Sequence, residues 1–287
     1  MAFGKNIQTW FEGRWHDGDI PVMRAADHGL WQGSSVFDGA RYAHGLTPDL
    51  SLHCARVNDS ARALMITPTM EAGEIEKIIR DGLKSYSAEQ AVYIRPMYWA
   101  IDGGDLGVNP KEGSTGFAIC LEEVPFPAAE FQTTVTRTRF RRPVLEDSVC
   151  NAKAGCLYPN NARMLVEARQ KGFGNALVAD AMGNLAESAT ANVFLVRDGV
   201  VFTPIPNGTF LAGITRARHI ANLRADGVEV VETVLTFDDA LAADEVFLSG
   251  NFAKVTSVRR FDDREYRHRD MTERVRRLYW DWAAQHG

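Results

Sequence analysis

The sequence lacks several features that would assign it to a special class of protein. Its 287 residues include only four cysteines, none of them in a CxxC pair, so we expect free thiols and no disulfide framework. Its seven histidines show no HxxH or HExxH spacing, and we expect no bound metal. No apolar run approaches a membrane span and no signal-peptide core follows Met1, which predicts a cytoplasmic protein without a membrane partner.

A surplus of positive charge is also absent. The formal net charge is −5 at pH 7 and the isoelectric point is near 5.8, which argues against a nucleic-acid partner. The one locally basic stretch, residues 137–142, alternates arginine with threonine and phenylalanine, a pattern typical of a strand with one charged face. Hydrophobic residues make up 45% of the chain and charged residues 24%, which indicates an ordinary globular protein.

Proline residues divide the chain into two parts. Pro125-Phe-Pro127 marks an interdomain linker over residues 125–129, between a small N-terminal domain over residues 1–124 and a large C-terminal domain over residues 130–287. Strand and helix patterns occur in both parts, which predicts an α/β protein of mixed α+β character with two domains.

The periodicity of apolar residues predicts the individual elements. We expect a hairpin over residues 7–16 that turns at Glu12-Gly13, and a second hairpin that turns at Asp198-Gly199. Helices are expected over residues 52–65, 71–86, 159–171, 214–225 and 271–284, and strands over residues 91–99, 115–123, 131–138, 175–180, 192–196, 200–203, 228–234 and 244–249.

Three residues near the middle of the chain offer complementary chemistry. Lys153 is followed by Tyr158 and later by Glu187. A lysine amine forms an imine with an aldehyde once it has lost its proton. A carboxylate can keep a pyridine nitrogen protonated, and a phenol can hydrogen-bond a neighbouring oxygen. A lone lysine in a loop is usually a solvated charge, so the assignment depends on matches elsewhere in the chain.

The spacing of this amine, phenol and carboxylate resembles the coenzyme site of the branched-chain aminotransferase family, also called the fold type IV or class IV transaminases. The resemblance implies a two-domain fold with pyridoxal 5′-phosphate (PLP) at the domain interface. It assigns Lys153, in the C-terminal domain, as the catalytic residue that binds the coenzyme aldehyde. It also assigns Glu187 to the pyridine nitrogen and Tyr158 to the phenolic oxygen of the coenzyme.

Two further blocks resemble the family's phosphate contacts. Arg56 on the first predicted helix stands where the family has a phosphate-binding arginine, whose planar fork suits adjacent phosphate oxygens. Gly213-Ile214-Thr215 resembles the family's phosphate cup, in which N–H groups at a helix N-terminus and a threonine hydroxyl hold an anion. Read alone, the first would be a surface arginine and the second an ordinary capped helix.

The remaining matches concern the substrate. Val36-Phe37-Asp38-Gly39 is similar to the family's Val-Phe-Glu-Gly stretch, and Tyr93-Ile94-Arg95 to a strand that recognises the substrate carboxylate. Gly250 begins a turn where the family presents backbone amides to the α-carboxylate. The resemblance therefore implies substrate contacts at Phe37, Arg41, Tyr93, Arg95 and Gly250, and a coenzyme contact at Asn251. It also implies a homodimer or higher homo-oligomer in which a loop around Arg41 reaches a neighbour's pocket.

Two substrate positions depart from the family pattern. Gln32 stands where branched-chain enzymes typically have a tyrosine, and Asn251-Phe252 stands where they have Thr-Ala. Gln32 removes a phenol ring and Phe252 adds bulk, so the preferred donor is the open question.

The matched blocks indicate a PLP-dependent transaminase that moves an amino group between an amino acid and a 2-oxo acid. We expect the freed Lys153 amine to move the proton from the α-carbon as general base and acid. Tyr93 and Arg95 favour a branched-chain amino-acid aminotransferase, whereas Gln32 and Phe252 favour an (R)-selective amine or D-amino-acid transaminase. Aminodeoxychorismate lyase, a β-elimination enzyme of the same fold, is a weaker alternative, and a PLP-binding protein without turnover is the reading from a different class.

Overall fold

The structure, a computed structural model, describes residues 4–287 and divides into two compact units. The first unit extends to Phe126 and includes Ala152–Leu157 and His286–Gly287; the second holds Pro127–Asn151 and Tyr158–Gln285. The boundary after Phe126 falls inside the segment expected as a linker. Mixed strands and helices in both units confirm the predicted α/β class.

The first unit is built on an antiparallel sheet. Its strands are β1 (Lys5–Phe11), β2 (Arg14–Asp17), β3 (Ser35–Phe37), β4 (Ala40–Tyr42), β5 (Val92–Ala100) and β6 (Thr115–Glu123), in the order β2-β1-β6-β5-β3 with β4 also paired to β5. The predicted first hairpin is confirmed: Glu12 and Gly13 join β1 to β2 with φ of 49° and 82°. Positive φ at both central residues is the geometry of a turn that matches strand twist.

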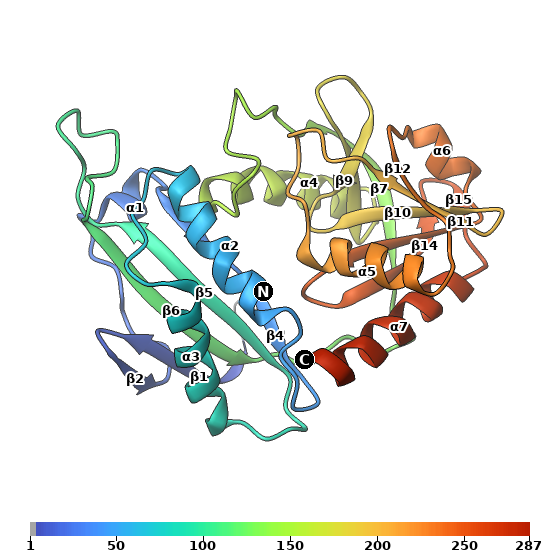
Figure 1. The fold of residues 1–287 in the computed structure, drawn as a ribbon. Helices are drawn as coiled ribbons and strands as arrows, with labels where there is room; N and C mark the ends of the chain where they lie inside the picture. Colours follow the sequence, from blue (N-terminus) through green and yellow to red (C-terminus); the bar gives the residue numbers. More distant parts are fainter. Residues whose placement is uncertain (1–3) are drawn as a thin grey trace. The chain divides into compact units, whose positions relative to one another are not determined.

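Two helices cover one face of this sheet (Figure 1). They are α2 (Leu50–Ala63) and α3 (Ala72–Gly82); the short elements α1 (His28–Trp31) and η1 (Leu83–Ser85) complete the unit. In α3, Ile75 and Ile79 are one turn apart and fully buried, so the helix turns one apolar stripe inward. Gly82 lets α3 approach closely, because a Cβ there would lie 2.2 Å from the Trp15 ring.

The second unit is built on a larger, mixed sheet. Its strands are β7 (Gln132–Arg141), β8 (Asn175–Ala179), β9 (Leu185–Ser188), β10 (Asn192–Arg197), β11 (Val200–Pro204), β12 (Val230–Thr233), β13 (Glu245–Gly250), β14 (Lys254–Phe261) and β15 (Arg264–Glu265). Their order is β12-β11-β10-β13-β14-β7-β8-β9, with β15 paired to β14. The predicted Asp198-Gly199 turn joins β10 to β11 with φ of 51° and 78°.

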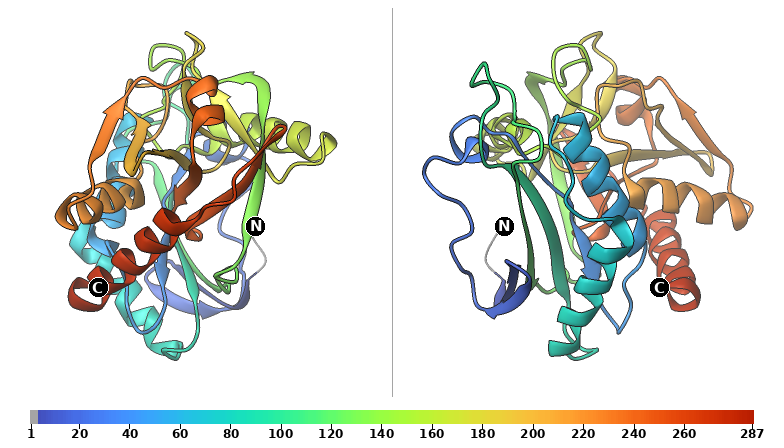
Figure 2. Two further views of the ribbon diagram at one scale, coloured as in Figure 1. Left: turned by 90° about the vertical axis from the view of Figure 1, so that its right-hand side faces the viewer. Right: turned by 60° about the vertical axis from the view of Figure 1, so that its left-hand side comes forward.

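Four helices pack against this sheet from several points of the chain: α4 (Tyr158–Gln170), α5 (Ile214–Ala225), α6 (Phe237–Ala242) and α7 (Asp270–His286). The short η2 (Gly155–Leu157) belongs to the first unit, where it contacts β3. Met164 and Ala168 of α4 pack on Ala176 and Val178 of β8. Figure 2 shows α7, in dark red, as one unbroken helix near the end of the chain.

Five strands lie outside the predicted elements: β3, β4, β9, β14 and β15. Strand β9 spans four residues between the Gly183 turn and a tight loop, too short for a period-two pattern to stand out, and β3, β4 and β15 are shorter still. Strand β14 begins at Lys254, just after the turn at Gly250. None of the helices in the described part of the chain combines the length and apolar character of a membrane span. The four cysteines, all within that part, are free thiols.

Candidate active site

The segment around Lys153 is anchored on the first unit. The Lys153 N–H donates to Ser60 Oγ of α2 at 3.1 Å, and its carbonyl accepts the N–H of Phe37 at 3.1 Å. Ala154 forms an antiparallel bridge with Val36. The Lys153 amine lies 4.8 Å from the centre of the Phe37 ring. We expected Lys153 in the C-terminal domain; these backbone bonds to β3 and α2 place it in the first unit instead.

Arg56 is held by a buried carboxylate beside this segment. Its Nε and Nη2 atoms donate to the two oxygens of Asp38 at 2.6 and 2.9 Å. His53, one turn earlier on α2, lies 2.7 Å from Asp38 Oδ1 through Nδ1. Burial raises the pKa of Asp38, but the charges of Arg56 and His53 outweigh it and hold that pKa well below its usual range. The guanidinium of Arg56 is therefore oriented before any ligand arrives.

Strand pairing brings two of the expected substrate residues together. Arg95 forms an ion pair with the buried carboxylate of Glu122, and its guanidinium lies 5.1 Å from the centre of the Tyr93 ring. Gly39 makes room for Tyr93, because a Cβ at Gly39 would lie 2.2 Å from the Tyr93 hydroxyl. Gln32, by contrast, is exposed at the C-terminal end of α1.

Arg41 has partners within the first unit. It lies on strand β4, opposite Tyr93, and is fully buried. Its Nη2 atom donates to the Val124 carbonyl at 2.5 Å, and its guanidinium lies 4.1 Å from the centre of the Phe126 ring. Burial lowers the pKa of Arg41 to about 10. A substrate contact at Arg41, and a loop around it that reaches a neighbouring subunit, stay predictions.

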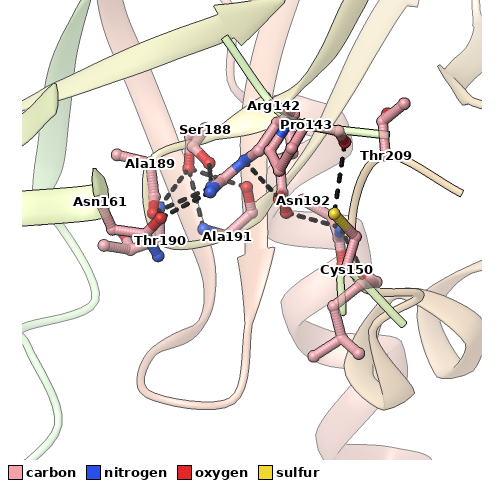
Figure 3. Close-up of polar contacts among 12 residues, drawn as sticks. Arg142, Pro143, Cys150, Asn161, Ser188, Ala189, Thr190, Ala191, Asn192 and Thr209 are labelled. Atoms are coloured by element: carbon pink, nitrogen blue, oxygen red, sulfur yellow. Dashed lines mark hydrogen bonds and ion pairs between the residues drawn. The ribbon is translucent and has the colours of Figure 1, made fainter. Parts of the chain in front are cut away.

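In the second unit, a buried arginine lies beside Glu187. Glu187 lies on β9 and is 9% exposed; Arg142 is 8% exposed and its Nε atom lies 2.9 Å from Glu187 Oε1. Arg142 Nη2 also donates to the carbonyls of Ser188 and Ala189 at 3.1 and 3.2 Å (Figure 3). The guanidinium thereby holds both the carboxylate and the backbone that follows it.

Arg142 also connects Glu187 to helix α4. Its Nη1 atom donates to Asn161 Oδ1 at 2.5 Å, and Asn161 lies one turn after Tyr158, the first residue of α4. Tyr158 is 37% exposed, so its phenol is accessible. The alternation over residues 137–142 predicts a charged strand face and does not single out Arg142. A signal in the sequence is that Arg141 and Arg142 are adjacent, and adjacent residues of an extended chain point to opposite sides.

The expected phosphate cup lies close to the same carboxylate. Asn192 Nδ2 lies 3.3 Å from Glu187 Oε2, and a Cβ on Gly213 would lie 2.2 Å from Asn192 Oδ1. Gly213 is the N-cap residue of α5, directly before its first residue. Because glycine has no side chain, it cannot cap the first N–H groups of that helix, those of Ile214 and Thr215. An uncapped helix N-terminus is the positive end of the helix and favours an anion.

The turn between β13 and β14 contains Gly250, Asn251 and Phe252. A Cβ on Gly250 would lie 3.2 Å from the Cβ of Ala191, so this turn also approaches the loop after Glu187. Within the second unit, Glu187, Gly213 and Gly250 are therefore gathered around the short loop that precedes β10. Lys254, which opens β14 directly after this turn, is buried, and no sequence motif pointed to it.

Comparisons with known proteins agree with this arrangement. The family model for amino-transferase class IV matches residues 35–261. The branched-chain-amino-acid aminotransferase of Escherichia coli strain K12 is 33% identical, and the match covers 99% of each chain. The chain belongs to the class IV aminotransferases.

Solved structures of related proteins extend the match to three dimensions. An aminotransferase from Brucella abortus, whose crystal structure was solved with PLP bound, is 53% identical, with a TM-score of 0.96 over 98% of this chain and 100% of that one. A branched-chain aminotransferase from Thermoproteus uzoniensis, solved with norvaline, is 25% identical, with a TM-score of 0.88 over 98% and 95%. The class IV resemblance and the fold it implied are thus confirmed.

Proposed function

We propose that the chain is a PLP-dependent transaminase that moves an amino group between a branched-chain amino acid and a 2-oxo acid. The observation that carries the proposal is its similarity, along 99% of both chains, to the branched-chain-amino-acid aminotransferase of Escherichia coli. The class of reaction follows from membership of the class IV aminotransferases. The identity of the amino donor goes beyond the reaction class, and it is this identity that we propose.

The second unit has features that suit PLP. The uncapped N-terminus of α5 suits a phosphate, and the buried Glu187 suits a protonated ring nitrogen. We assign the phosphate to Arg56, Ile214 and Thr215, the ring nitrogen to Glu187 and the phenolic oxygen to Tyr158. These assignments rest on motif position, and on the orientation that Asp38 and Arg142 give to Arg56 and Glu187.

Lys153 has the acid–base role in this proposal. When bound, PLP withdraws electrons from the carbon that loses a proton. The Nζ atom of Lys153 would hold the coenzyme until the donor replaces it. The freed amine would then take the proton from the donor α-carbon and deliver it to the coenzyme carbon on the other side of the transferred nitrogen. The backbone bonds of Lys153 to Ser60 and Phe37 fix the base of its side chain during this transfer.

The substrate carboxylate is assigned to Tyr93, Arg95 and the turn at Gly250. Arg95 is already paired with Glu122, so a carboxylate ligand would have to share or replace that ion pair. Arg41 is left out of the assignment because it is buried within the first unit. Phe37, next to the Lys153 amine, is assigned to the apolar wall of the pocket.

A donor screen tests the proposal directly. Leucine, glutamate, D-alanine and (R)-1-phenylethylamine would each be offered with pyruvate or 2-oxoglutarate as acceptor, and the absorbance of bound PLP followed. We expect leucine with 2-oxoglutarate to give the highest kcat/KM and to convert the coenzyme to its amine form. A higher kcat/KM for the amine or for D-alanine would replace the branched-chain assignment, and an unchanged spectrum with every donor would refute transamination.

We also propose a cytoplasmic homodimer, on the pattern of the family resemblance. Light scattering coupled to size-exclusion chromatography tests the assembly: a mass near twice the monomer's 31.8 kDa is expected, and a monomer mass would contradict it.

A further inference from the structure

A pocket of about 460 Å³ lies within the first unit, and none of the residues assigned to coenzyme or substrate lines it. Its walls come from strands β1, β5 and β6 and from the segment between β2 and α1. Four of its lining side chains are aromatic: Trp10, Phe11, Trp99 and Phe117. Its volume falls within the range of about 300–1,000 Å³ that is typical of sites for small molecules.

The indole of Trp99 is held in place at this pocket. Gly116 lies opposite Trp99 in the pairing of β5 with β6, and a Cβ on Gly116 would lie 2.2 Å from the indole. The ring of Phe11 stacks on it, with 6.3 Å between ring centres and 27° between ring planes. The indole Nε1–H donates to Asp27 Oδ2 at 3.0 Å. A ring held at three points loses little freedom when a ligand packs against it.

Asp27 is the buried charged residue of the pocket. It is only 4% exposed, and its Oδ2 atom accepts from the Trp99 indole and, at 3.1 Å, from the backbone N–H of Arg24. Both donors are neutral. Its Oδ1 atom accepts no hydrogen bond from residues 4–287, and no positively charged side chain in that range forms an ion pair with Asp27. Buried carboxylates are normally paired, so the chemical complement of Asp27 is a positive charge.

The other charged residues of the pocket are Glu12 and Arg24. Both are exposed, so solvent screens their opposite charges, and a ligand inside the pocket meets chiefly the charge of Asp27. The aromatic rings act in the same direction, because the face of an indole or phenyl ring attracts a cation. The rings also provide apolar surface for the hydrocarbon part of the same ligand.

We propose that this pocket binds an organic ammonium ion with an apolar body. Asp27 Oδ1 accepts a hydrogen bond from the ammonium group, and the rings of Trp10, Phe11 and Trp99 contact the hydrocarbon. This site is additional to the amino-donor site of the proposed function and does not depend on it.

A tertiary amine tests the pocket without reacting with the coenzyme. N,N-dimethyl-2-phenylethylamine is protonated at pH 7 and has one N–H donor, but it cannot form an imine with an aldehyde. It would be titrated into PLP-loaded protein by calorimetry, with 3-phenylpropionate as a probe of similar size and opposite charge. The Trp99 indole N–H signal in 15N NMR reports where the amine binds, and Trp99→Phe assigns that signal.

Three variants change the pocket in different ways. Asp27→Asn keeps the size of the side chain but removes its charge, and we expect it to raise the Kd of the amine about 10-fold or more. Phe11→Leu removes one ring and should raise the Kd about 3- to 10-fold. Arg24→Gln removes a positive charge from the pocket and should not raise the Kd, whereas a site for an anion would be weakened by it.

Asp81→Asn is the matched control, because this carboxylate is exposed on α3 and paired with Lys84. It should leave the Kd unchanged. An amine Kd in Asp27→Asn equal to that of wild type would overturn the proposal, as would tighter binding of 3-phenylpropionate than of the amine. No binding of the amine to wild-type protein, or binding without a shift of the Trp99 signal, would also overturn it.

Circular dichroism checks that each variant folds. If Asp27→Asn does not fold, Phe11→Leu and the comparison of the two probes decide. Failure of the proposed function is distinguishable, because the donor screen follows turnover whereas this titration follows binding alone.

Discussion

At the scale of single residues, the main question is which lysine binds the coenzyme. Lys153 is half-buried, and Lys254 is almost fully buried with its amine on Asn251. The motif match favours Lys153, because the Tyr158 and Glu187 spacings are counted from it. If the coenzyme aldehyde bound the Lys254 amine instead, it would displace the contact of that amine with Asn251. A buried polar atom of Asn251 would then be left without this partner.

Lys153→Ala is expected to abolish transamination and leave the fold intact, because we assign to this amine both the bond to the coenzyme and the proton transfer. Activity with leucine and 2-oxoglutarate, circular dichroism, and peptide mapping after borohydride reduction measure this. Lys171→Ala is the control, since its exposed amine pairs with Glu167. Coenzyme found on Lys254 after reduction would disprove the assignment.

At the scale of elements, two buried ion pairs connect separate segments. Asp38, which follows β3, holds His53 and Arg56 of α2; Arg142, which follows β7, holds β9 and α4. Removing one member of such a pair leaves a buried charge without its counterion, which typically lowers stability by about 3–5 kcal/mol. Both pairs also orient residues assigned to the coenzyme.

Asp38→Asn is expected to lower the free energy of unfolding at pH 7 by about 3 kcal/mol. It should also make that free energy less dependent on pH in the acid range. The pKa of Asp38 is lower in the folded than in the unfolded protein, so its contribution is present above about pH 4 and is lost as the pH falls through the folded-state value. Denaturant unfolding from pH 7 down to pH 3 measures this. The exposed Asp59→Asn is the control. A parallel loss of stability in wild type and Asp38→Asn would argue against the role given to Asp38.

Arg142→Lys should slow transamination at least 10-fold with little change in PLP affinity. An ammonium is a single point charge and cannot span Glu187, Asn161 and the two carbonyls at once. Steady-state kinetics together with 15N NMR of labelled PLP, which reports the protonation of the ring nitrogen, separates positioning from loss of fold. Arg141→Lys, at the neighbouring exposed position, is the control. Wild-type kinetics and 15N shift in Arg142→Lys would show that Glu187 needs no such support.

At the scale of the whole molecule, we expect two positions that depart from the family pattern to affect donor preference. Gln32 belongs to the first unit and Phe252 to the second, and both depart from the family pattern. We expect the double variant Gln32→Tyr/Phe252→Ala to shift the ratio of kcat/KM for leucine over (R)-1-phenylethylamine towards leucine. The shift should be about 10- to 200-fold, the usual effect of one contact in an apolar pocket.

Both kcat/KM values would be measured in wild type, in each single variant and in the double variant. Met182→Ala, which truncates a highly exposed side chain of the second unit, is the control. An unchanged ratio in the double variant would show that these positions do not set the donor preference.

The sequence alone determined the family and most of the longer elements. Helix 214–225 was predicted at the residues where α5 lies, and strand 115–123 at those of β6, because helix and strand periods are local properties of the chain. The class IV assignment also depends on local information, because short motifs in a fixed order along the chain can be recognised without knowledge of the fold.

Only the tertiary structure decided where charges are buried. The sequence places Arg142 in a stretch typical of a charged strand face and gives no signal at Lys254, yet both side chains are buried, as is that of Arg41. The partners of Arg142 lie 19 to 47 residues along the chain, and no spacing rule connects them. The attachment of Lys153 to β3 likewise depends on backbone bonds to a strand formed more than a hundred residues earlier. Burial of a charge depends on which distant segments fold over it, and that information is absent from any local pattern.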